Sequence, residues 1–214
     1  MQLIYCYDAY CGWCYGFSPV MLKIAEEYKD ILTVDVLSGG MIRPEKKVHI
    51  EKSAAYILGA YKNVEDLTGI KFGEDYLWHL NHPEESDWYP DSEKPAIAMC
   101  IFKEYYPERA VEFAGDLLVA LHFEGRDLTD DEAYRHLLEK YSIQPETFYE
   151  KLASKEYKEL ARYEFSLMPQ LQVTGYPCVF LQTGELKFQM VARGFTDHDT
   201  LKGRIEKALK EITT

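Results

Sequence analysis

The sequence predicts an α/β fold in which two small strand-containing units come before and after a long helical segment of the chain. The first unit reads β-α-β, with an apolar, aromatic strand over residues 2–7, an amphipathic helix, and a β-branched strand over 31–37. The last unit reads β-β-α, with two strands joined by a turn over 183–185 and then a helix. Because β-α-β crossovers are right-handed and join parallel strands, we expect the first two strands to run parallel.

Local signals mark the elements of these two units. Pro19 lies early in the first helix, whose apolar face carries Val20, Met21, Ile24, Ala25 and Tyr28. Ser38-Gly39-Gly40 ends the second strand and is interpreted as a turn. Residues 176–181 and 187–192 are predicted to pair as a hairpin, and Asp197 is expected to cap the final helix.

No strand is predicted between residues 44 and 169. Apolar spacing indicates a helix over 53–61, and three prolines within 81–95 indicate a loop or lid. Ser92 is expected to cap the next helix, and Thr129-Asp130-Asp131-Glu132 is interpreted as a capping box. Three further helices are expected to begin at Pro107, Pro145 and Ser154.

The overall composition excludes several classes of protein. The 214 residues contain 24 Lys and Arg against 36 Asp and Glu, which gives a net charge of −12. Nucleic acids and anionic lipids both require clustered cations, so neither is an expected partner. The N-terminus lacks the basic start and apolar stretch of a signal peptide, and no apolar run approaches the ~18 residues of a membrane span. We therefore predict a cytoplasmic protein.

The cysteines point to chemistry rather than to a disulfide scaffold. The chain has five cysteines, an odd number that is small for its length: Cys6, Cys11, Cys14, Cys100 and Cys178. The first three lie within the first fourteen residues. Cys6 and Cys100 are interpreted as buried packing residues. For Cys178, core packing and a redox role both stay open. The six histidines show no triad or metal spacing and are expected at the surface.

The strongest motif is Cys11-Gly12-Trp13-Cys14, at the junction of the first strand with the first helix. Free amide groups and the helix dipole at such a junction stabilise a thiolate, which lowers the thiol pKa from its usual ~8.5. Cys11 lies at the exposed end and is the expected attacking thiol, while Cys14 lies one turn further and is the expected resolving thiol. This arrangement performs thiol–disulfide exchange.

Metal binding is the main alternative for these thiols. No second C-x-x-C and no nearby histidine completes a set of four zinc ligands. Cys6 together with the motif matches the C-x4-C-x2-C spacing of plant-type ferredoxins, but that cluster is held by a Gly/Ser-rich loop, whereas Cys6 lies in an aromatic strand. We therefore expect no metal.

A second motif, Gly175-Tyr176-Pro177-Cys178, opens the third strand. Proline at the start of an apolar strand is unusual because it cannot donate to the ladder. A cis peptide bond before Pro177 accounts for it and leaves the Tyr176 carbonyl free to bind an extended substrate. Cys178 is a candidate third thiol beside the working pair. The aromatic residues of 76–89 are expected to pack in the core rather than line a substrate groove.

Together these motifs resemble the DsbA family of the thioredoxin fold, and the residues from Asp8 to Phe17 look most like its cytoplasmic, FrnE-like branch of disulfide isomerases. The resemblance covers the whole chain in element order. It implies that Cys11 is the nucleophile, Cys14 the resolving thiol and Pro177 the cis-proline. Tyr176 is expected at the lip of the site, where it and Pro177 position the substrate. It also implies a discontinuous thioredoxin-like domain over 1–43 and 170–214, with a helical subdomain inserted over 44–169.

The chain differs from this family at one position. Six residues before the first cysteine, the family usually has a buried carboxylate. Tyr5 occupies that position here, which leaves Asp8 either as the proton acceptor for Cys14 or as a partner of local amides. Gly12 and Trp13 are expected to tune the pair. Since Trp13 supplies no cation, we hypothesise a redox potential of ~ −200 to −270 mV, near thioredoxin and glutaredoxin rather than DsbA at ~ −120 mV.

The function predicted from the sequence is a disulfide reductase or isomerase with no metal or organic cofactor, and with glutathione as an optional co-substrate. Its expected substrates are protein or low-molecular-weight disulfides and thiols. A glutathione-dependent transferase or isomerase of the kappa-class or chromene-carboxylate type is one rival, although those enzymes carry Ser where Cys11 stands. A non-catalytic binding protein or holdase that uses the helical subdomain is the other. The oligomeric state stays open.

Overall fold

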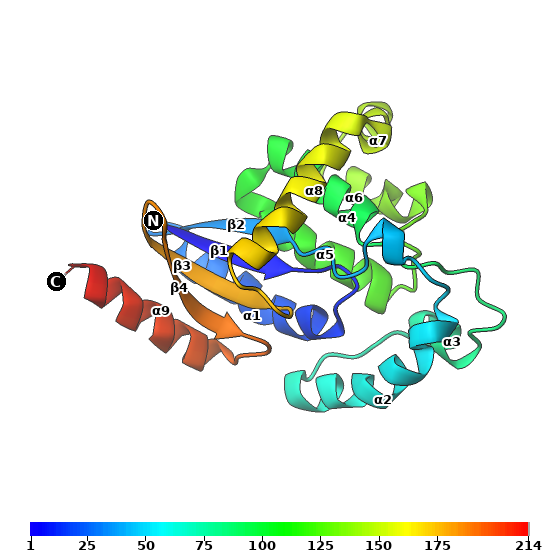
Figure 1. The fold of residues 1–214 in the computed structure, drawn as a ribbon, viewed down its shortest axis with the longest axis horizontal. Coiled ribbons are helices and arrows are strands. Elements are labelled where there is room, and N and C mark those ends of the chain that lie inside the picture. Colours follow the sequence, from blue (N-terminus) through cyan, green and yellow to red (C-terminus); the bar gives the residue numbers. More distant parts are fainter. Residues whose placement is uncertain (214) are drawn as a thin grey trace.

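The structure of the chain is a computed structural model that describes residues 1–213 (Figure 1). The sheet has four strands in the order β2-β1-β3-β4: β1 (Gln2–Tyr7), β2 (Thr33–Ser38), β3 (Cys178–Gly184) and β4 (Lys187–Arg193). β1 and β2 are parallel, whereas β3 is antiparallel to both of its neighbours. The predicted β-α-β and β-β-α units are therefore confirmed, and they meet in the centre of the sheet, where β1 pairs with β3.

Side-chain alternation along β1 explains the layers on either side of the sheet. Leu3, Tyr5 and Tyr7 pack in the main core with α1 (Gly12–Tyr28) and α9 (His198–Thr213). Ile4 and Cys6 point to the other face, where they pack with Met168 of α8. Figure 1 accordingly shows α9 and α8 on opposite sides of the sheet.

Helices fill the chain between β2 and β3, and within the described residues none of the segment 44–169 is a strand, as predicted. The α-helices are α2 (Glu51–Thr68), α3 (Glu74–Asn81), α4 (Glu93–Tyr105), α5 (Ala110–His122), α6 (Arg135–Lys140), α7 (Pro145–Ala153) and α8 (Lys155–Gln170). Short 3-10 turns cover Pro44–Lys46, Pro107–Arg109 and Asp131–Tyr134. The predicted helix over 53–61 is longer in the structure, and α3 lies in a segment for which no helix was predicted.

Two predicted caps differ in the structure. α4 begins directly after Ser92, as predicted, but without the capping bond. Ser92 makes no capping hydrogen bond to α4, because its hydroxyl instead donates to Asp8 and accepts from the Ile42 amide. Thr129 does not open a capping box; its amide and hydroxyl both bond to Asp127, and Asp130 caps the following 3-10 turn. The predicted helix starts at Pro107, Pro145, Ser154 and Asp197 are confirmed.

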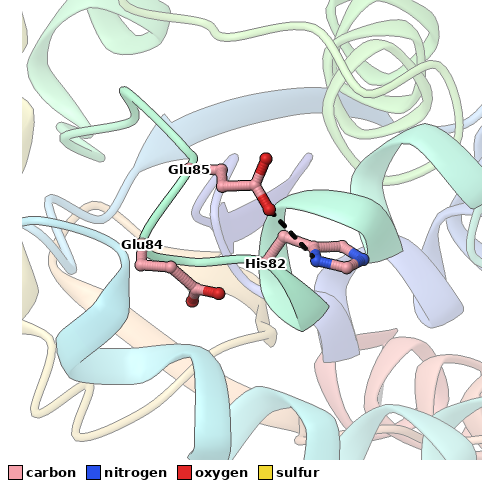
Figure 2. A group of neighbouring side chains, drawn as sticks. All are labelled: His82, Glu84 and Glu85. Carbon is pink, nitrogen blue, oxygen red and sulfur yellow. Dashed lines mark ion pairs between the residues drawn. The ribbon is translucent and has the colours of Figure 1, made fainter.

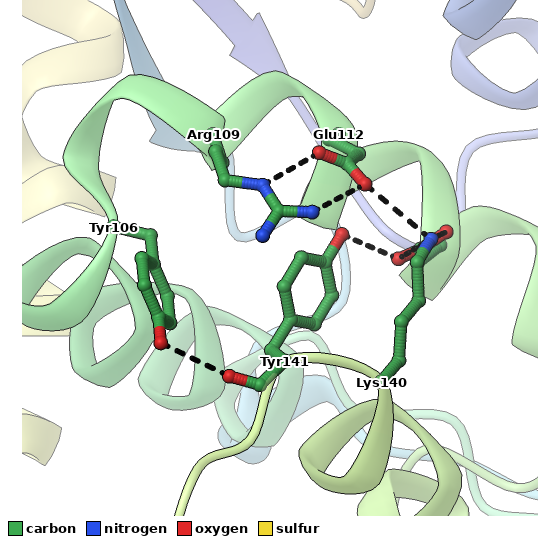
Figure 3. A network of polar contacts seen from close by, with 6 residues as sticks. Tyr106, Arg109, Glu112, Lys140 and Tyr141 are labelled. Carbon is green, nitrogen blue, oxygen red and sulfur yellow. Dashed lines mark hydrogen bonds and ion pairs between the residues drawn. The ribbon is translucent and has the colours of Figure 1, made fainter.

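Polar networks join the helices to one another and to the sheet. On the surface, Arg109 pairs with Glu112 of α5, Lys140 reaches the same carboxylate, and Tyr106 donates to the Tyr141 carbonyl (Figure 3). In the interior, Lys103 of α4 contacts Glu164 of α8 at 2.5 Å and donates to the Val36 carbonyl of β2. This second network attaches the helical segment to an edge strand of the sheet.

The prediction that all six histidines lie at the surface is wrong for His122. This side chain is fully buried, and its ring stacks on Tyr15 at 5.2 Å and lies 5.1 Å from Tyr76. Burial lowers the pKa of His122 to about 4, so the imidazole is neutral at physiological pH. As a neutral ring it serves as a packing residue behind the start of α1.

Candidate active site

Cys11 occupies the N-cap position of α1, where the chain leaves β1 and turns into the helix. Its sulfur accepts a hydrogen bond from the Cys14 amide at 3.4 Å and lies 3.5 Å from the Tyr176 carbonyl, to which the thiol donates. The side chain is 6% exposed and lines a cavity. A thiolate at this position would still accept the hydrogen bond from the Cys14 amide, and it would lie at the positive end of the helix dipole.

Cys14 lies one turn further along α1, and its environment differs from that of Cys11. The side chain is fully buried, and both cysteines are free thiols in this structure. Burial, followed by the contact with Cys11, raises the pKa of Cys14 well above its usual value. The prediction that Cys11 lies at an exposed end is wrong, because the side chain is buried beside the Tyr176 loop. The two sulfurs are still chemically unequal: Cys11 lines a cavity, whereas Cys14 is completely enclosed and holds its proton.

The start of β3 lies directly against the start of α1. The peptide bond between Tyr176 and Pro177 is cis, and the Tyr176 carbonyl faces the Cys11 sulfur. The Tyr176 hydroxyl donates to the Gly39 carbonyl at 2.8 Å, while the Pro177 carbonyl accepts from Gly194 at 2.7 Å. These contacts hold the loop before β3 in place between the end of β2 and the end of β4.

Gly39 is expected to be essential for the position of Tyr176, because a Cβ atom there would overlap the Tyr176 ring. Replacing Gly39 by Ala should lower the rate of the thiol–disulfide exchange predicted from the sequence about tenfold, since overpacking of about 1–3 kcal/mol would displace Tyr176 and, with it, the carbonyl that faces Cys11. Gly59→Ala on α2 is the matched control, because nothing lies within 4 Å of its Cβ position. Insulin-reduction rates of both variants test this, and a fully active Gly39→Ala protein would contradict it.

Asp8 follows β1 and is almost completely buried. One carboxylate oxygen accepts from the Tyr10 amide and the Ser92 hydroxyl, and the other accepts from the Met41 amide at 2.7 Å. Burial raises the pKa of Asp8, although these donors oppose the shift. Asp8 therefore joins three segments of chain beside the motif. The role of Ser92 in this junction was not predicted, because its position in the sequence is typical of a helix cap.

Tyr5 fills the position where the resembled family usually carries a buried carboxylate. Its hydroxyl is buried beside Cys14 and has no partner of ordinary hydrogen-bond geometry among the described residues. Burial, and then the neighbouring cysteines of the motif, raises the pKa of Tyr5. This position therefore holds a neutral phenol and not the buried carboxylate that the resembled family usually has there.

Cys178 follows Pro177, but its side chain belongs to the small core cluster behind the sheet. It lies directly opposite Cys6 in the pairing of β1 with β3, and its thiol donates to the Gly175 carbonyl at 3.2 Å. Cys6 and Cys100 are also buried, as predicted. The working motif and the Cys6–Cys178 pair thus lie on different faces of the sheet.

A cavity of about 320 Å³ opens beside the motif, between the start of α1 and the helical segment. Gly12 and Trp13 form part of its wall together with Cys11. Tyr76 and Trp88 are 4% exposed and pack in the core, yet they also line this cavity. The sequence alone did not indicate the cavity, because its wall combines residues from six separated segments.

One group of neighbouring side chains outside this region has donor atoms suited to a metal ion. The ligand atoms of His82, Glu84 and Glu85 lie within 4.8 Å of one another, and all three residues are exposed (Figure 2). His82 and Glu85 form an ion pair at 3.6 Å. This is the geometry of an ordinary surface ion pair, and it includes none of the cysteines.

The fold and the site define an oxidoreductase of the thioredoxin type. They combine a thioredoxin-type sheet, a C-x-x-C at the start of the first helix and a cis-proline loop that faces it. The chain belongs to the family of DSBA-like thioredoxin domains, whose sequence model matches residues 2–206. This confirms the resemblance seen in the sequence. No curated protein matches the chain significantly.

Solved structures share the whole fold. A protein of Nitrosomonas europaea, provisionally described as a disulfide isomerase, is 23% identical with a TM-score of 0.83, and the alignment covers 98% of each chain. The cytosolic disulfide reductase DsbM of Pseudomonas aeruginosa is 24% identical with a TM-score of 0.79, covering 99% of this chain and all of the other. A 2-hydroxychromene-2-carboxylate isomerase is 17% identical with a TM-score of 0.65, covering 100% and 96%.

Proposed function

We propose that the protein is a cytoplasmic thiol–disulfide oxidoreductase that reduces or isomerises disulfides. The observation that carries this proposal is the inequality of the two sulfurs of the motif. Cys11 caps α1, accepts from the Cys14 amide and faces a cavity, whereas Cys14 is fully enclosed. A nucleophile needs access and thiolate stabilisation, and a resolving thiol needs only to reach the nucleophile.

The reaction follows from these positions. The Cys11 thiolate attacks one sulfur of the substrate disulfide, which forms a mixed disulfide and releases the first substrate thiolate. Cys14 then gives up its proton and attacks the Cys11 sulfur, which releases the second substrate thiol and leaves a Cys11–Cys14 disulfide. The Tyr176 carbonyl, 3.5 Å from the Cys11 sulfur, is placed to accept a hydrogen bond from the substrate backbone. Asp8 is a positioning residue, since it holds the segments around the motif together.

The comparisons support the reducing direction and the compartment in this proposal. DsbM is described as a cytosolic disulfide reductase, and another structure of it, with a TM-score of 0.77 to this chain, contains GSH. We extend thiol and disulfide substrates, and a cytoplasmic location, to this chain. No helix among residues 1–213 is both long and apolar enough to cross a bilayer, which is compatible with that location.

A glutathione-dependent isomerase is the second candidate, because the chromene-carboxylate isomerase has a related fold. Those enzymes resemble this chain but carry Ser at the position of Cys11. The intact pair of thiols favours disulfide exchange, since an isomerase that only binds glutathione has no need of a resolving cysteine.

Trapping of the mixed disulfide tests the proposal. Cys14→Ser removes the resolving thiol, so the protein should accumulate covalent adducts through Cys11 that dithiothreitol releases. The matched control is the double variant Cys11→Ser with Cys14→Ser, which should trap nothing. Mass spectrometry of adducts from a cytosolic lysate reads the result. Protein or small disulfide adducts support an oxidoreductase, whereas glutathione as the sole adduct would favour the isomerase, and no adduct would contradict both.

A further inference from the structure

Two cysteines outside the working motif lie directly opposite each other in the sheet. Cys6 of β1 and Cys178 of β3 are paired positions of the antiparallel ladder. Both are free thiols, and both side chains point to the face of the sheet that α8 covers, where they pack with Met168. Neither sulfur takes part in the exchange reaction described above, so these two buried nucleophiles have no role in it.

The spacing of paired strand positions suits a disulfide. Residues directly opposite in an antiparallel ladder have Cα atoms about 4.5 or about 5.5 Å apart, depending on whether the pair is hydrogen-bonded. The Cα atoms of a disulfide lie about 4.4–6.8 Å apart, so both spacings fall within its range. The two Cβ atoms also leave the sheet on the same side, because directly paired residues share a face. A bond between Cys6 and Cys178 therefore requires side-chain rotation rather than a rearrangement of either strand.

The two thiols differ in how close they lie to solvent. Cys6 lies in β1, which has a strand on each side, and its side chain is completely enclosed. Cys178 is the first residue of β3, and its thiol donates at 3.2 Å to the carbonyl of Gly175, an exposed residue of the loop before the strand. A local opening of this loop can uncover Cys178 while the strands stay paired. A reagent therefore reaches Cys178 first, and Cys6 lies behind it.

The charges around the two sulfurs favour the same order of reaction. Burial raises the pKa of both thiols, and at Cys6 the neighbouring Cys178 and then Asp35 of β2 add to the rise. At Cys178 the guanidinium of Arg193, its paired residue on β4, and the Gly194 amide oppose the rise. A thiol whose anion is stabilised is the better nucleophile, so Cys178 is the expected attacking thiol and Cys6 the resolving one.

From this arrangement we propose that Cys6 and Cys178 form a second redox couple, which low-molecular-weight disulfides such as glutathione disulfide oxidise to a cross-strand disulfide. The couple contains neither sulfur of the motif, so it does not depend on the function proposed above. Its oxidised form joins β1 to the residue that follows Pro177, and hence to the loop that faces Cys11. Oxidation by small disulfides therefore changes the covalent structure directly beside the active site.

The oxidation proceeds by two exchange steps. The Cys178 thiolate attacks one sulfur of the small disulfide, which forms a mixed disulfide at Cys178 and releases the first small thiolate. The Cys6 sulfur loses its proton and attacks the Cys178 sulfur, which releases the second small thiolate. The protein gives up two electrons and two protons, and the small disulfide accepts them and leaves as two thiols.

The double variant Cys11→Ser with Cys14→Ser tests this couple in the absence of the working pair. It keeps three of the five cysteines: Cys6, Cys100 and Cys178. The reduced variant is incubated with glutathione disulfide under native conditions. We expect each protein to release two glutathione thiols and to lose the mass of two hydrogen atoms. Peptide mapping should place the new disulfide between Cys6 and Cys178, and dithiothreitol should reverse it.

Cys100 provides the matched control. It is a free, buried thiol on α4 that packs in the main core, apart from the cluster that contains Cys6 and Cys178. Cys100→Ala in the same background should still release two thiols per protein. Cys6→Ala should instead release one and hold one glutathione at Cys178, because the second step has no attacking thiol. Thermal unfolding checks that each variant is folded.

The outcomes separate this couple from the proposed function. Release of two thiols with a mapped disulfide between Cys6 and Cys178 supports the couple, whatever the protein does with other substrates. A double variant that keeps all three thiols, or that holds glutathione at Cys178 without closing to Cys6, would overturn it. Equal oxidation of Cys100 would also overturn it, because the reaction would then require general unfolding. A lack of insulin reduction by the unaltered protein would count against the proposed function alone.

Discussion

Replacing Cys11 by Ser is expected to abolish disulfide reduction, with a fall on the order of a thousandfold or more. A serine hydroxyl stays protonated at neutral pH and cannot form a mixed disulfide, so the first step is lost entirely. The fold should survive, because Cys11 is the N-cap of α1 and serine is among the best residues for that position. Insulin reduction, measured beside thermal unfolding, separates the loss of chemistry from a loss of stability.

A second cysteine provides the matched control for this experiment. Cys100 on α4 is buried, as Cys11 is, but it lies outside the motif and the cavity wall. Cys100→Ser makes the same chemical change and should keep activity within about twofold of the unaltered protein, because no reacting atom is touched. The assignment of Cys11 would be wrong if Cys11→Ser retained more than a small fraction of the rate.

Lys103→Met is expected to destabilise the protein by about 3–5 kcal/mol, the usual cost of removing one partner of a buried ion pair. Glu164 is 6% exposed, and burial raises its pKa even though Lys103 lies 2.5 Å away. Without Lys103, the carboxylate would keep the hydrogen bond from the Ser38 amide but would lose the ammonium group that balances its charge. The Val36 carbonyl would also lose the ammonium group that now binds it.

Urea unfolding measures this effect, and two further variants control it. Lys103→Met combined with Glu164→Leu should recover much of the loss, because no uncompensated charge then stays buried. Lys155→Met breaks a surface pair with Glu159 whose side chains are 88% and 65% exposed, and should change stability by less than about 1 kcal/mol. A Lys103→Met protein as stable as Lys155→Met would show that the interior pair is dispensable.

Helix caps were predictable from the sequence where the capping residue and its partner lie within a few residues of one another. Ser154 caps α8 through the Tyr157 amide, and Asp197 bonds to the Thr200 amide in the same way. Ser92 has an equally good capping pattern in the sequence, but its hydroxyl donates to Asp8, 84 residues away, and makes no capping bond. A local cap cannot compete with a buried carboxylate that needs a donor, and the sequence holds no sign that the two residues meet.

The candidate site divides in a similar way. Both cysteines and Pro177 could be identified as candidates from their local sequence, because a thiol at a helix start and a proline at a strand start are each unusual. The contact of Tyr176 with Gly39 was not recognisable, although the glycine pair was visible as a turn. His122 was placed at the surface because its sequence neighbours do not reveal that Tyr15 and Tyr76 enclose its ring.

The sequence by itself determined the order of elements, the all-helical segment between β2 and β3, and the thiol motif at the start of α1. These depend on periodicity and on residue chemistry over short distances, which the chain carries wherever it lies. The tertiary structure alone decided which sulfur is enclosed, which face of the sheet receives Cys178, and which rings surround the cavity beside Cys11. Each depends on burial among residues distant in the chain, and burial is a property of the assembled fold.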